Sequence, residues 1–175
     1  MRKNNHTTCK IYVACLAAYN NGYLHGAWID ANLGEDVIWN GIKEVLASSP
    51  IPEAEEWAIH DYEGFEGLYL SEYEGIDSVC EKAEFIEEHG QLGAELASHF
   101  GGDINEARTA LSDQYAGAYR SLAEFAEELT EDTTEIPDNL QYYIDYERMG
   151  RDFELNGDVF VIELSFDDVH IFWSR

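Results

Sequence analysis

The sequence predicts an α+β protein made of three small segments: a mixed α/β segment, a helical middle and a closing α+β segment. Three observations support this prediction. Alternating apolar residues precede an Asn-Gly turn near the start, apolar residues follow helical spacing through the middle, and alternation returns at the end. A chain of 175 residues is long enough for several small domains. We therefore expect domains at residues 1–61, 62–104 and 105–175.

The first domain is expected to contain three strands and one helix. The stretch "KIYVACLAAY" predicts a strand over Lys10–Tyr19, and Asn21-Gly22 predicts a hairpin turn before a returning strand over Tyr23–Asp30. The segment "LGEDVIWNGIKEVLASS" places apolar residues on one helical face and acidic residues at its start, where they suit the helix dipole. The stretch "EEWAIHDYE" alternates again and predicts the third strand.

The middle and last domains are expected to be mainly helical before a closing β element. The stretches "SEYEGIDSVCEKAEFIEEHG" and "QLGAELASHFGGD" predict two helices separated at Gly90. A long helix, broken once between Ser112 and Gly117, is predicted for "INEARTALSDQYAGAYRSLAEFAEELTED". Pro137 is expected to open a short helix, because proline suits the first helical position. The final "DVFVIELSFDDVHIFWSR" predicts strands.

The charge of the chain is its most unusual feature. It carries 36 acidic and 10 basic residues, for a formal net charge of -26. From Ile11 to Ala107 only Lys43 and Lys82 are basic. Such a surface repels nucleic acid and anionic lipid, and it attracts basic partners and cations. We expect neither nucleic acid nor a membrane to be a partner.

Hydropathy and cysteine content indicate a cytoplasmic protein. No apolar run reaches the length of a transmembrane helix. The apolar stretch near the start alternates like a strand and leads into a turn, which favours a folded element over a signal peptide. The three cysteines, Cys9, Cys15 and Cys80, are odd in number and lack metal-ligand spacing, as expected for reduced thiols.

No motif in the chain indicates catalysis or a cofactor. Neither a G-x-S-x-G elbow nor a phosphate-binding glycine loop is present, and pairs of carboxylates arise by chance in so acidic a chain. Histidine lies near carboxylates in "HDYE" at 60–63, "EEH" at 87–89 and "DDVH" at 167–170. None of these matches a zinc-protease motif or a calcium loop. We expect no catalytic residue, cofactor or metal, with a metal-binding protein as an alternative.

Two interpretations explain the charge. A general acidic surface of the halophile type distributes carboxylates everywhere and needs no defined partner. A mimic of nucleic acid instead arranges them in rows, because duplex DNA carries one negative charge per about 1.7 Å. Helix positions three or four apart lie about 5–6 Å from each other. Either of the two clearest rows alone is typical of a solvated helix face, so the case for the mimic rests on the near absence of lysine between them. The rows are Glu81, Glu84, Glu87, Glu88 and Glu124, Glu127, Glu128, Glu131.

The predicted binding surface extends beyond these two rows. The stretch "EEWAIHDYEGFEGLYLSEYEG" is dense in carboxylates and contains no lysine or arginine. Its aromatic residues are expected to pack inside a thin domain and not to touch a partner: Trp57, Tyr62, Phe65, Tyr69 and Tyr73. Its acidic residues complete the predicted surface: Glu55, Glu56, Asp61, Glu63, Glu66, Glu72 and Glu74.

Three stretches of the chain resemble the ArdA antirestriction proteins. They are "IYVACLAAYNNGYLHGAWIDA", "WAIHDYEGFEG" followed by "LSEYEGIDSV", and "IPDNLQYYIDYERMGRDFELNGDVFVIE". The resemblance implies an antirestriction protein of mobile genetic elements that mimics double-stranded DNA. It implies that the partner is a type I restriction-modification enzyme and that the mimic occupies the DNA-binding cleft in the methyltransferase core of that enzyme. Restriction, and in some members modification, is inhibited.

The same resemblance implies an elongated three-domain chain and a homodimer formed through the C-terminal domain. The aromatic content of that domain also predicts a two-fold dimer, because about 70 residues do not readily bury so much apolar surface. By resemblance, the family's antirestriction motif falls between Leu140 and Leu155. It includes Tyr142, Tyr143, Asp145, Tyr146 and Glu147.

Overall fold

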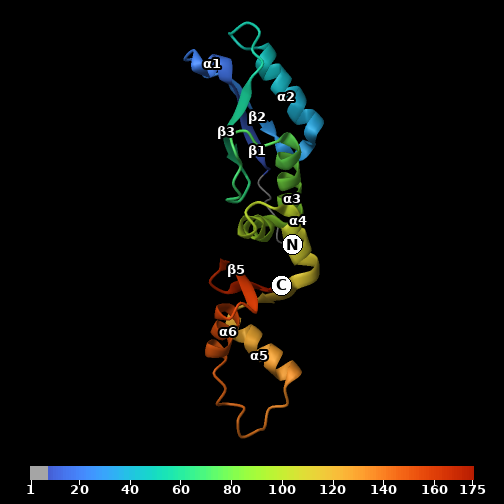
Figure 1. Cartoon of the computed structure of the whole chain (residues 1–175), viewed down its shortest axis with the longest axis vertical. Helices are drawn as coiled ribbons and strands as arrows, with labels where there is room; N and C mark the ends of the chain where they lie inside the picture. The colour runs from blue at the N-terminus through green and yellow to red at the C-terminus, as the bar shows by residue number, and fades with distance from the viewer. Residues whose placement is uncertain (1–7) are drawn as a thin grey trace. The chain divides into compact units, whose positions relative to one another are not determined.

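The computed structural model describes residues 8–175, so residues 1–7 of the expected first domain lie outside the described part. The chain divides into two compact units, Met1–Ile104 and Asn105–Arg175. Each unit holds a three-stranded antiparallel sheet together with helices (Figure 1). The predicted α+β class is therefore confirmed, whereas the division into three domains stays a prediction.

The sheet of the first unit has β1 (Lys10–Cys15) at its centre. β2 (Gly26–Asp30) and β3 (Trp57–Glu63) pair with β1 on either side, both antiparallel. The fully buried side chains of Ile11 and Val13 show why β1 is central: its apolar residues face the core. The three predicted strands are confirmed.

The first strand is shorter than its sequence indicates. It ends at Cys15, and the next residues form the short helix α1 (Leu16–Asn20), so the strand prediction is wrong beyond Cys15. The helical turn places Ala18 in a buried cluster with Cys15 and Val45. Alternation of small apolar residues fits a strand or a helix equally, and this long-range packing decides between them.

Helix α2 (Glu35–Ala47) covers one face of this sheet and matches the prediction. Its approach to β2 is close: a Cβ at Gly41 would lie 2.7 Å from Cδ1 of Ile29. A larger residue at this position would force the Ile29 side chain to move. The residues that α2 buries are Ile38, Ile42 and Val45.

Helix α3 (Ile76–His99) bends sharply at Gly90, whose φ of 61° and ψ of -146° are not helical. The prediction of two helices separated at this glycine is confirmed. Only glycine adopts such a conformation readily. Within residues 8–175, no helix is both long enough and apolar enough to span a membrane.

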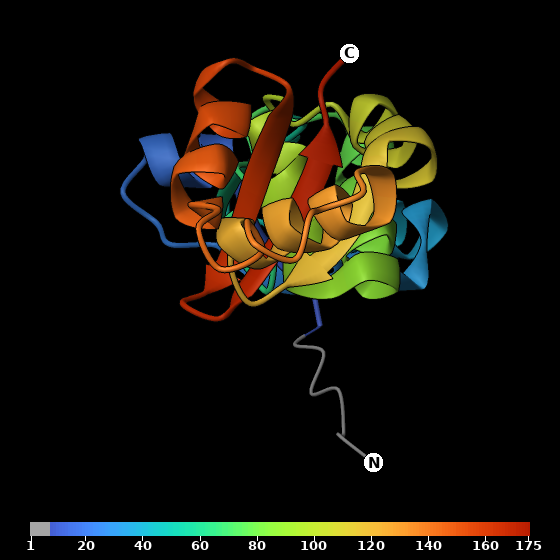
Figure 2. The same ribbon diagram turned by 90° about the horizontal axis from the view of Figure 1, so that it is seen from below.

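The sheet of the second unit has the order β4-β6-β5 and is antiparallel throughout. It consists of β4 (Tyr115–Tyr119), β5 (Val159–Ser165) and β6 (Asp168–Trp173), and the last two confirm the predicted closing strands. Helices α5 (Leu122–Thr133) and α6 (Tyr146–Leu155) pack beside this sheet (Figure 2). The shared core contains Phe125, Val159, Val169 and Ile171.

The long helix predicted after residue 103 does break between Ser112 and Gly117 as expected, but the prediction is wrong for Tyr115–Tyr119, which form a strand. Helix α4 (Ile104–Thr109) and a π-helical turn over Ala110–Gln114 lead directly into strand β4. Gly117 in this strand has a φ of 135°, which a helix does not accommodate, and the pairing register with β6 shifts beside it. The spacing of Tyr115 and Tyr119 suggested a helix, but the pairing of β4 with β6 overrides it.

The prediction that Pro137 opens a helix is also wrong. Its carbonyl accepts a hydrogen bond from the Leu140 N–H at 2.9 Å in a turn, and the next helix begins only at Tyr146. The Asp145 carboxylate caps that helix by accepting from the Arg148 N–H at 3.0 Å. A capping aspartate accepts a hydrogen bond from an otherwise unpaired amide of the first helical turn, and this cap places the start of the helix at Tyr146.

Candidate functional site

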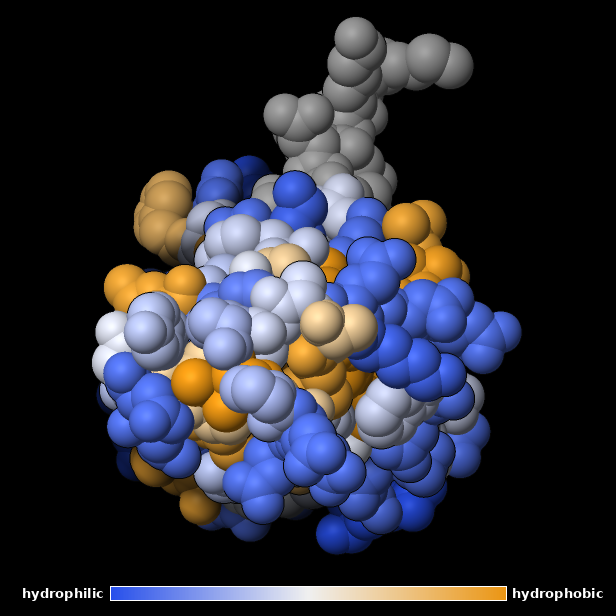
Figure 3. Space-filling model, turned by 90° about the horizontal axis from the view of Figure 1, so that it is seen from above, coloured by the Kyte–Doolittle hydropathy of each residue, from blue (hydrophilic) through white to orange (hydrophobic). Residues whose placement is uncertain are grey.

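The predicted acidic surface is largely formed by exposed side chains. Thirteen of the fifteen predicted carboxylate residues are exposed, and Glu74 and Glu124 are the exceptions. The face in Figure 3 is accordingly mostly hydrophilic, with separate hydrophobic patches. The exposed residues are Glu55, Glu56, Asp61, Glu63, Glu66, Glu72, Glu81, Glu84, Glu87, Glu88, Glu127, Glu128 and Glu131.

The acidic and basic side chains of helix α3 lie on different faces, the acidic ones outward and the lysine inward. The four acidic residues of its predicted row, Glu81, Glu84, Glu87 and Glu88, are all exposed. Lys82 is the lone lysine or arginine of this helix, and it is buried with 7% of its surface exposed. The outward face of α3 therefore carries carboxylates without any lysine or arginine.

Helix α5 presents a shorter row than predicted. Glu127, Glu128 and Glu131 are exposed, but Glu124 is half-buried and belongs to the start of the helix. The Glu124 N–H donates to Oγ of Ser121 at 3.1 Å, and Oε2 of Glu124 accepts from the Arg120 N–H at 2.7 Å. These two hydrogen bonds stabilise the start of the helix, so we assign Glu124 a structural role.

Glu74 faces inward and holds the segment after β3 against α3. Its Oε1 lies 2.6 Å from Nζ of Lys82, and the two side chains are only 13% and 9% exposed. Lys82 also donates to the carbonyl of Tyr69 at 3.3 Å. The other carboxylate oxygen of Glu74, Oε2, accepts a hydrogen bond from the Ser71 N–H at 2.9 Å. Glu74 is therefore a structural carboxylate in this fold.

Opposing effects set the pKa of Glu74. Burial by itself raises the pKa of this carboxyl. Hydrogen bonds from Lys82, Ser71 and Ser78, together with the charge of Lys82, outweigh burial and lower the pKa below its usual value of 4.5. The folded state therefore favours the ionised form of Glu74 over the protonated form.

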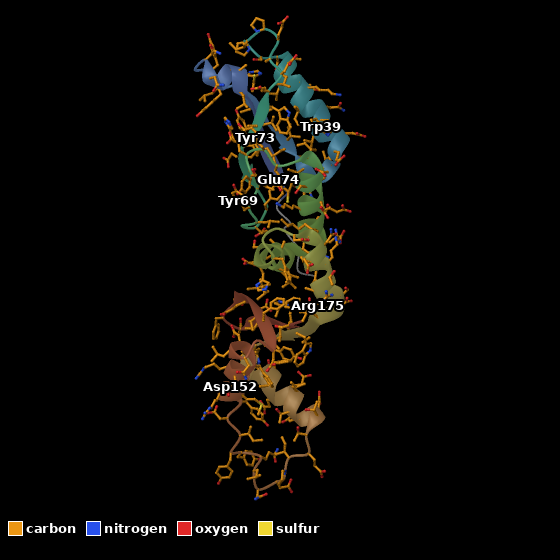
Figure 4. All side chains as sticks on the ribbon, viewed as in Figure 1. Trp39, Tyr69, Tyr73, Glu74, Asp152 and Arg175 are labelled. Carbon is orange, nitrogen blue, oxygen red and sulfur yellow. The ribbon has the colours of Figure 1, made fainter. Side chains whose placement is uncertain are left out.

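The aromatic residues of the acidic stretch do not share one role. Phe65 is buried and meets Tyr62 edge to face at 5.9 Å, which agrees with the predicted packing role. Tyr69 and Tyr73 are 70% and 68% exposed, so the packing prediction is wrong for both. They lie on the β3 side of the first unit, whereas Trp39 lies on α2 (Figure 4). Sequence alone did not distinguish these tyrosines from the buried phenylalanine.

The predicted family motif is mostly at the surface of the second unit. Tyr142 and Tyr143 are 89% and 84% exposed. Glu147 is exposed in the first turn of α6, Asp145 caps that helix, and Tyr146 is half-buried at its start. Two neighbouring tyrosines with almost their whole rings exposed are unusual for an isolated surface.

Several histidines in the described part of the chain lie in pairs with carboxylates. His170 lies between Oδ1 of Asp168, 3.0 Å from its Nε2, and Oη of Tyr115, 2.6 Å from its Nδ1. Burial and nearby carboxylates raise the pKa of the Cys9 thiol to about 12. Within residues 8–175, no group of three or more histidine, cysteine, aspartate or glutamate residues is arranged to hold a metal ion.

The fold and the surface together define an acidic α+β protein with exposed rows of carboxylates on its helices. Residues 11–168 match the model of a protein family described as antirestriction protein (ArdA). The chain belongs to the ArdA antirestriction family, which confirms the resemblance seen in the sequence. No curated protein matches the chain.

Replacement of Glu74 by glutamine is expected to destabilise the fold by about 2 kcal/mol, because it leaves the buried Lys82 ammonium without its anionic partner. Glu81→Gln, on the exposed face of α3, is the matched control and should change stability by less than about 0.5 kcal/mol. Denaturant unfolding monitored by circular dichroism measures both. Equal stability of the two variants at pH 7 would contradict this role of Glu74.

The same pair predicts a pH dependence. Because the folded state lowers the pKa of Glu74, its contribution is complete above the usual value of 4.5 and disappears as the pH falls through the lowered value. The stability difference between the wild type and Glu74→Gln should therefore shrink below pH 4.5. A difference that stays constant into strong acid would refute the assignment.

Proposed function

We propose that this protein inhibits type I restriction-modification enzymes by occupying their DNA-binding cleft as an anionic mimic of double-stranded DNA. Membership of the ArdA antirestriction family supports the functional class. One structural observation carries the mechanism: the only lysine of α3 is buried, and the exposed face of this helix bears a row of carboxylates. A cleft that binds phosphates would meet the same sign of charge on this face.

Helical rows suit this role because the helix fixes the distance between charges. Residues three or four positions apart lie about 5–6 Å from each other, close to the spacing of neighbouring phosphates along a strand. The buried residues of α3 hold the row in place, including Phe85 and Ile86 between its acidic positions. The backbone that carries the charges is thus positioned before the partner arrives, which reduces the free energy lost to ordering on association.

We propose that the active form is a homodimer joined through the second unit. The exposed Tyr142 and Tyr143, together with Leu140, Leu155 and Phe166, support a further protein contact on this unit. Twice the formal charge of -26 equals the charge of roughly 90 Å of duplex, or about 26 base pairs. Because these apolar side chains are exposed in a single chain, sedimentation equilibrium should show a dimer at micromolar concentration. A monomer throughout that range would refute the proposed homodimer.

Complex formation with the target is the direct test of mimicry. The protein is mixed with the methyltransferase core of a type I enzyme, with and without its DNA, and the mixtures are separated by gel filtration. A mimic should form a stable complex that DNA does not join, and inhibition should reach completion when the enzyme's DNA sites are saturated. A ternary complex with DNA, or loss of activity at far below one inhibitor per site, would exclude the mechanism.

Binding should be distributed over many carboxylates. An exposed ion pair contributes only about 0–1 kcal/mol, so Glu84→Gln alone should weaken inhibition by less than about fivefold. Neutralising the whole α3 row, Glu81, Glu84, Glu87 and Glu88, should weaken inhibition by at least on the order of tenfold. Titration of restriction activity measures each variant, and circular dichroism verifies the fold.

Salt provides the matched control for the row variants. The attraction should weaken as ionic strength rises, since fields are screened over about 10 Å at 0.1 M salt. The wild type should lose more affinity with salt than the variant lacking the α3 row, because it makes more ionic contacts. If Glu84→Gln alone abolished binding of a folded protein, a single specific site would have to replace the distributed surface.

A further inference from the structure

A small hollow in the first unit combines aromatic rings with carboxylates. It has a volume of about 360 Å³ and is lined by Leu16, Glu55, Glu56, Trp57 and Tyr73. These residues come from the start of α1, the segment before β3, the first residue of β3 and the segment after β3. The hollow lies apart in sequence from the carboxylate rows of α3 and α5. Unlike those rows, it combines carboxylates with two aromatic residues, Trp57 and Tyr73.

The walls of the hollow are fixed by contacts outside it. The Leu16 N–H donates to the carbonyl of Glu56 at 3.0 Å, which joins two of the walls. Trp57 meets Trp39 of α2 edge to face, with ring centroids 5.8 Å apart. The site is therefore held in shape without a ligand, which favours binding of a small group.

The wall formed by Tyr73 is anchored on both sides of that residue. The neighbouring Glu72 carbonyl accepts the Ile59 N–H of β3 at 2.9 Å. On its other side, Glu74 pairs with Lys82 of α3. Tyr73 itself remains 68% exposed, so its ring is available to a partner while its backbone is fixed.

The chemistry of the lining selects a cation. Within residues 8–175, no cationic side chain forms an ion pair with Glu55 or Glu56, and both are exposed. Faces of tryptophan and tyrosine attract cations through their ring quadrupoles. Leu16 supplies an apolar contact for an aliphatic stem, as long basic side chains require. Carboxylates exclude phosphate and other anions.

We propose that this hollow receives an arginine side chain from the enzyme that the protein inhibits, a role that rests on the proposed function. Guanidinium is planar, stacks on aromatic faces and pairs with carboxylates in a fork, whereas ammonium is a strongly hydrated point charge. Tyrosine and arginine are also enriched where a few residues dominate binding. Tyr73 and Trp57 thus add a directional contact to the distributed charge.

The test uses the four tryptophans of the full chain as reporters. The ¹⁵N-labelled protein is titrated with N-acetyl-arginine amide at constant ionic strength, and the indole signal of Trp57 is assigned by Trp57→Phe. The Trp57 signal should shift and saturate, while those of Trp28 and Trp173 should not. N-acetyl-citrulline amide, which is nearly isosteric but uncharged, should cause no shift, and N-acetyl-lysine amide should bind more weakly.

Variants of two equally exposed tyrosines provide the matched comparison. Tyr73→Leu should weaken arginine binding about threefold to fivefold, the range expected for an exposed cation–π contact. Tyr73→Phe keeps the ring face and should bind within about twofold of the wild type. Tyr69→Leu changes a tyrosine that does not line the hollow and should leave the titration unchanged.

Several results would overturn the inference. These are equal shifts with the citrulline or lysine derivative, shifts that grow without saturating at all four indoles, and a titration insensitive to Tyr73→Leu. Inhibition of the restriction enzyme by Tyr73→Leu and Tyr69→Leu is measured alongside. A wild type that inhibits but whose Trp57 does not respond refutes the arginine site alone. A wild type that fails to inhibit refutes the proposed function while the titration still reports on the hollow.

Discussion

Mutual repulsion among carboxylates is the constraint on which the rest of this structure depends. With 36 acidic and 10 basic residues, the folded chain concentrates negative charge that the unfolded chain keeps further apart. Apolar burial has to exceed this cost in each unit separately. In the first unit, the central strand β1 buries Ile11, Val13 and Cys15 completely. In the second, Phe125 joins two strands in a common core.

One of the few basic residues, Lys82, is placed in the interior, whereas most of the others in the described part are exposed: Lys43, Arg120, Arg148, Arg151 and Arg175. Lys82 neutralises Glu74 in the interior and contributes nothing to the outward face of α3. A surface lysine among Glu81, Glu84 and Glu87 would have relieved the repulsion more simply. Its absence keeps the outward field intact, and the fold obtains its stability from burial instead.

Two kinds of contact are available on such a surface. Under the proposed function, distributed carboxylates attract a basic cleft over a distance and tolerate the loss of single members, because each exposed pair contributes little. Exposed aromatic rings act only at contact and depend on orientation. The positions of Tyr73 and Trp57 beside Glu55 and Glu56 combine both kinds within one small area.

By itself, the sequence determined the fold class, the family and the acidic surface, because these depend on local patterns. Periodicity identified α2, the break at Gly90 and the closing strands, and composition identified the charge. The tertiary structure decided features that depend on distant partners. Pairing with β6 made Tyr115–Tyr119 a strand, and Lys82 turned Glu74 inward although its neighbour Glu72 is exposed. Burial separated Phe65 from Tyr69 and Tyr73, since an aromatic residue in the sequence does not reveal which groups will cover it.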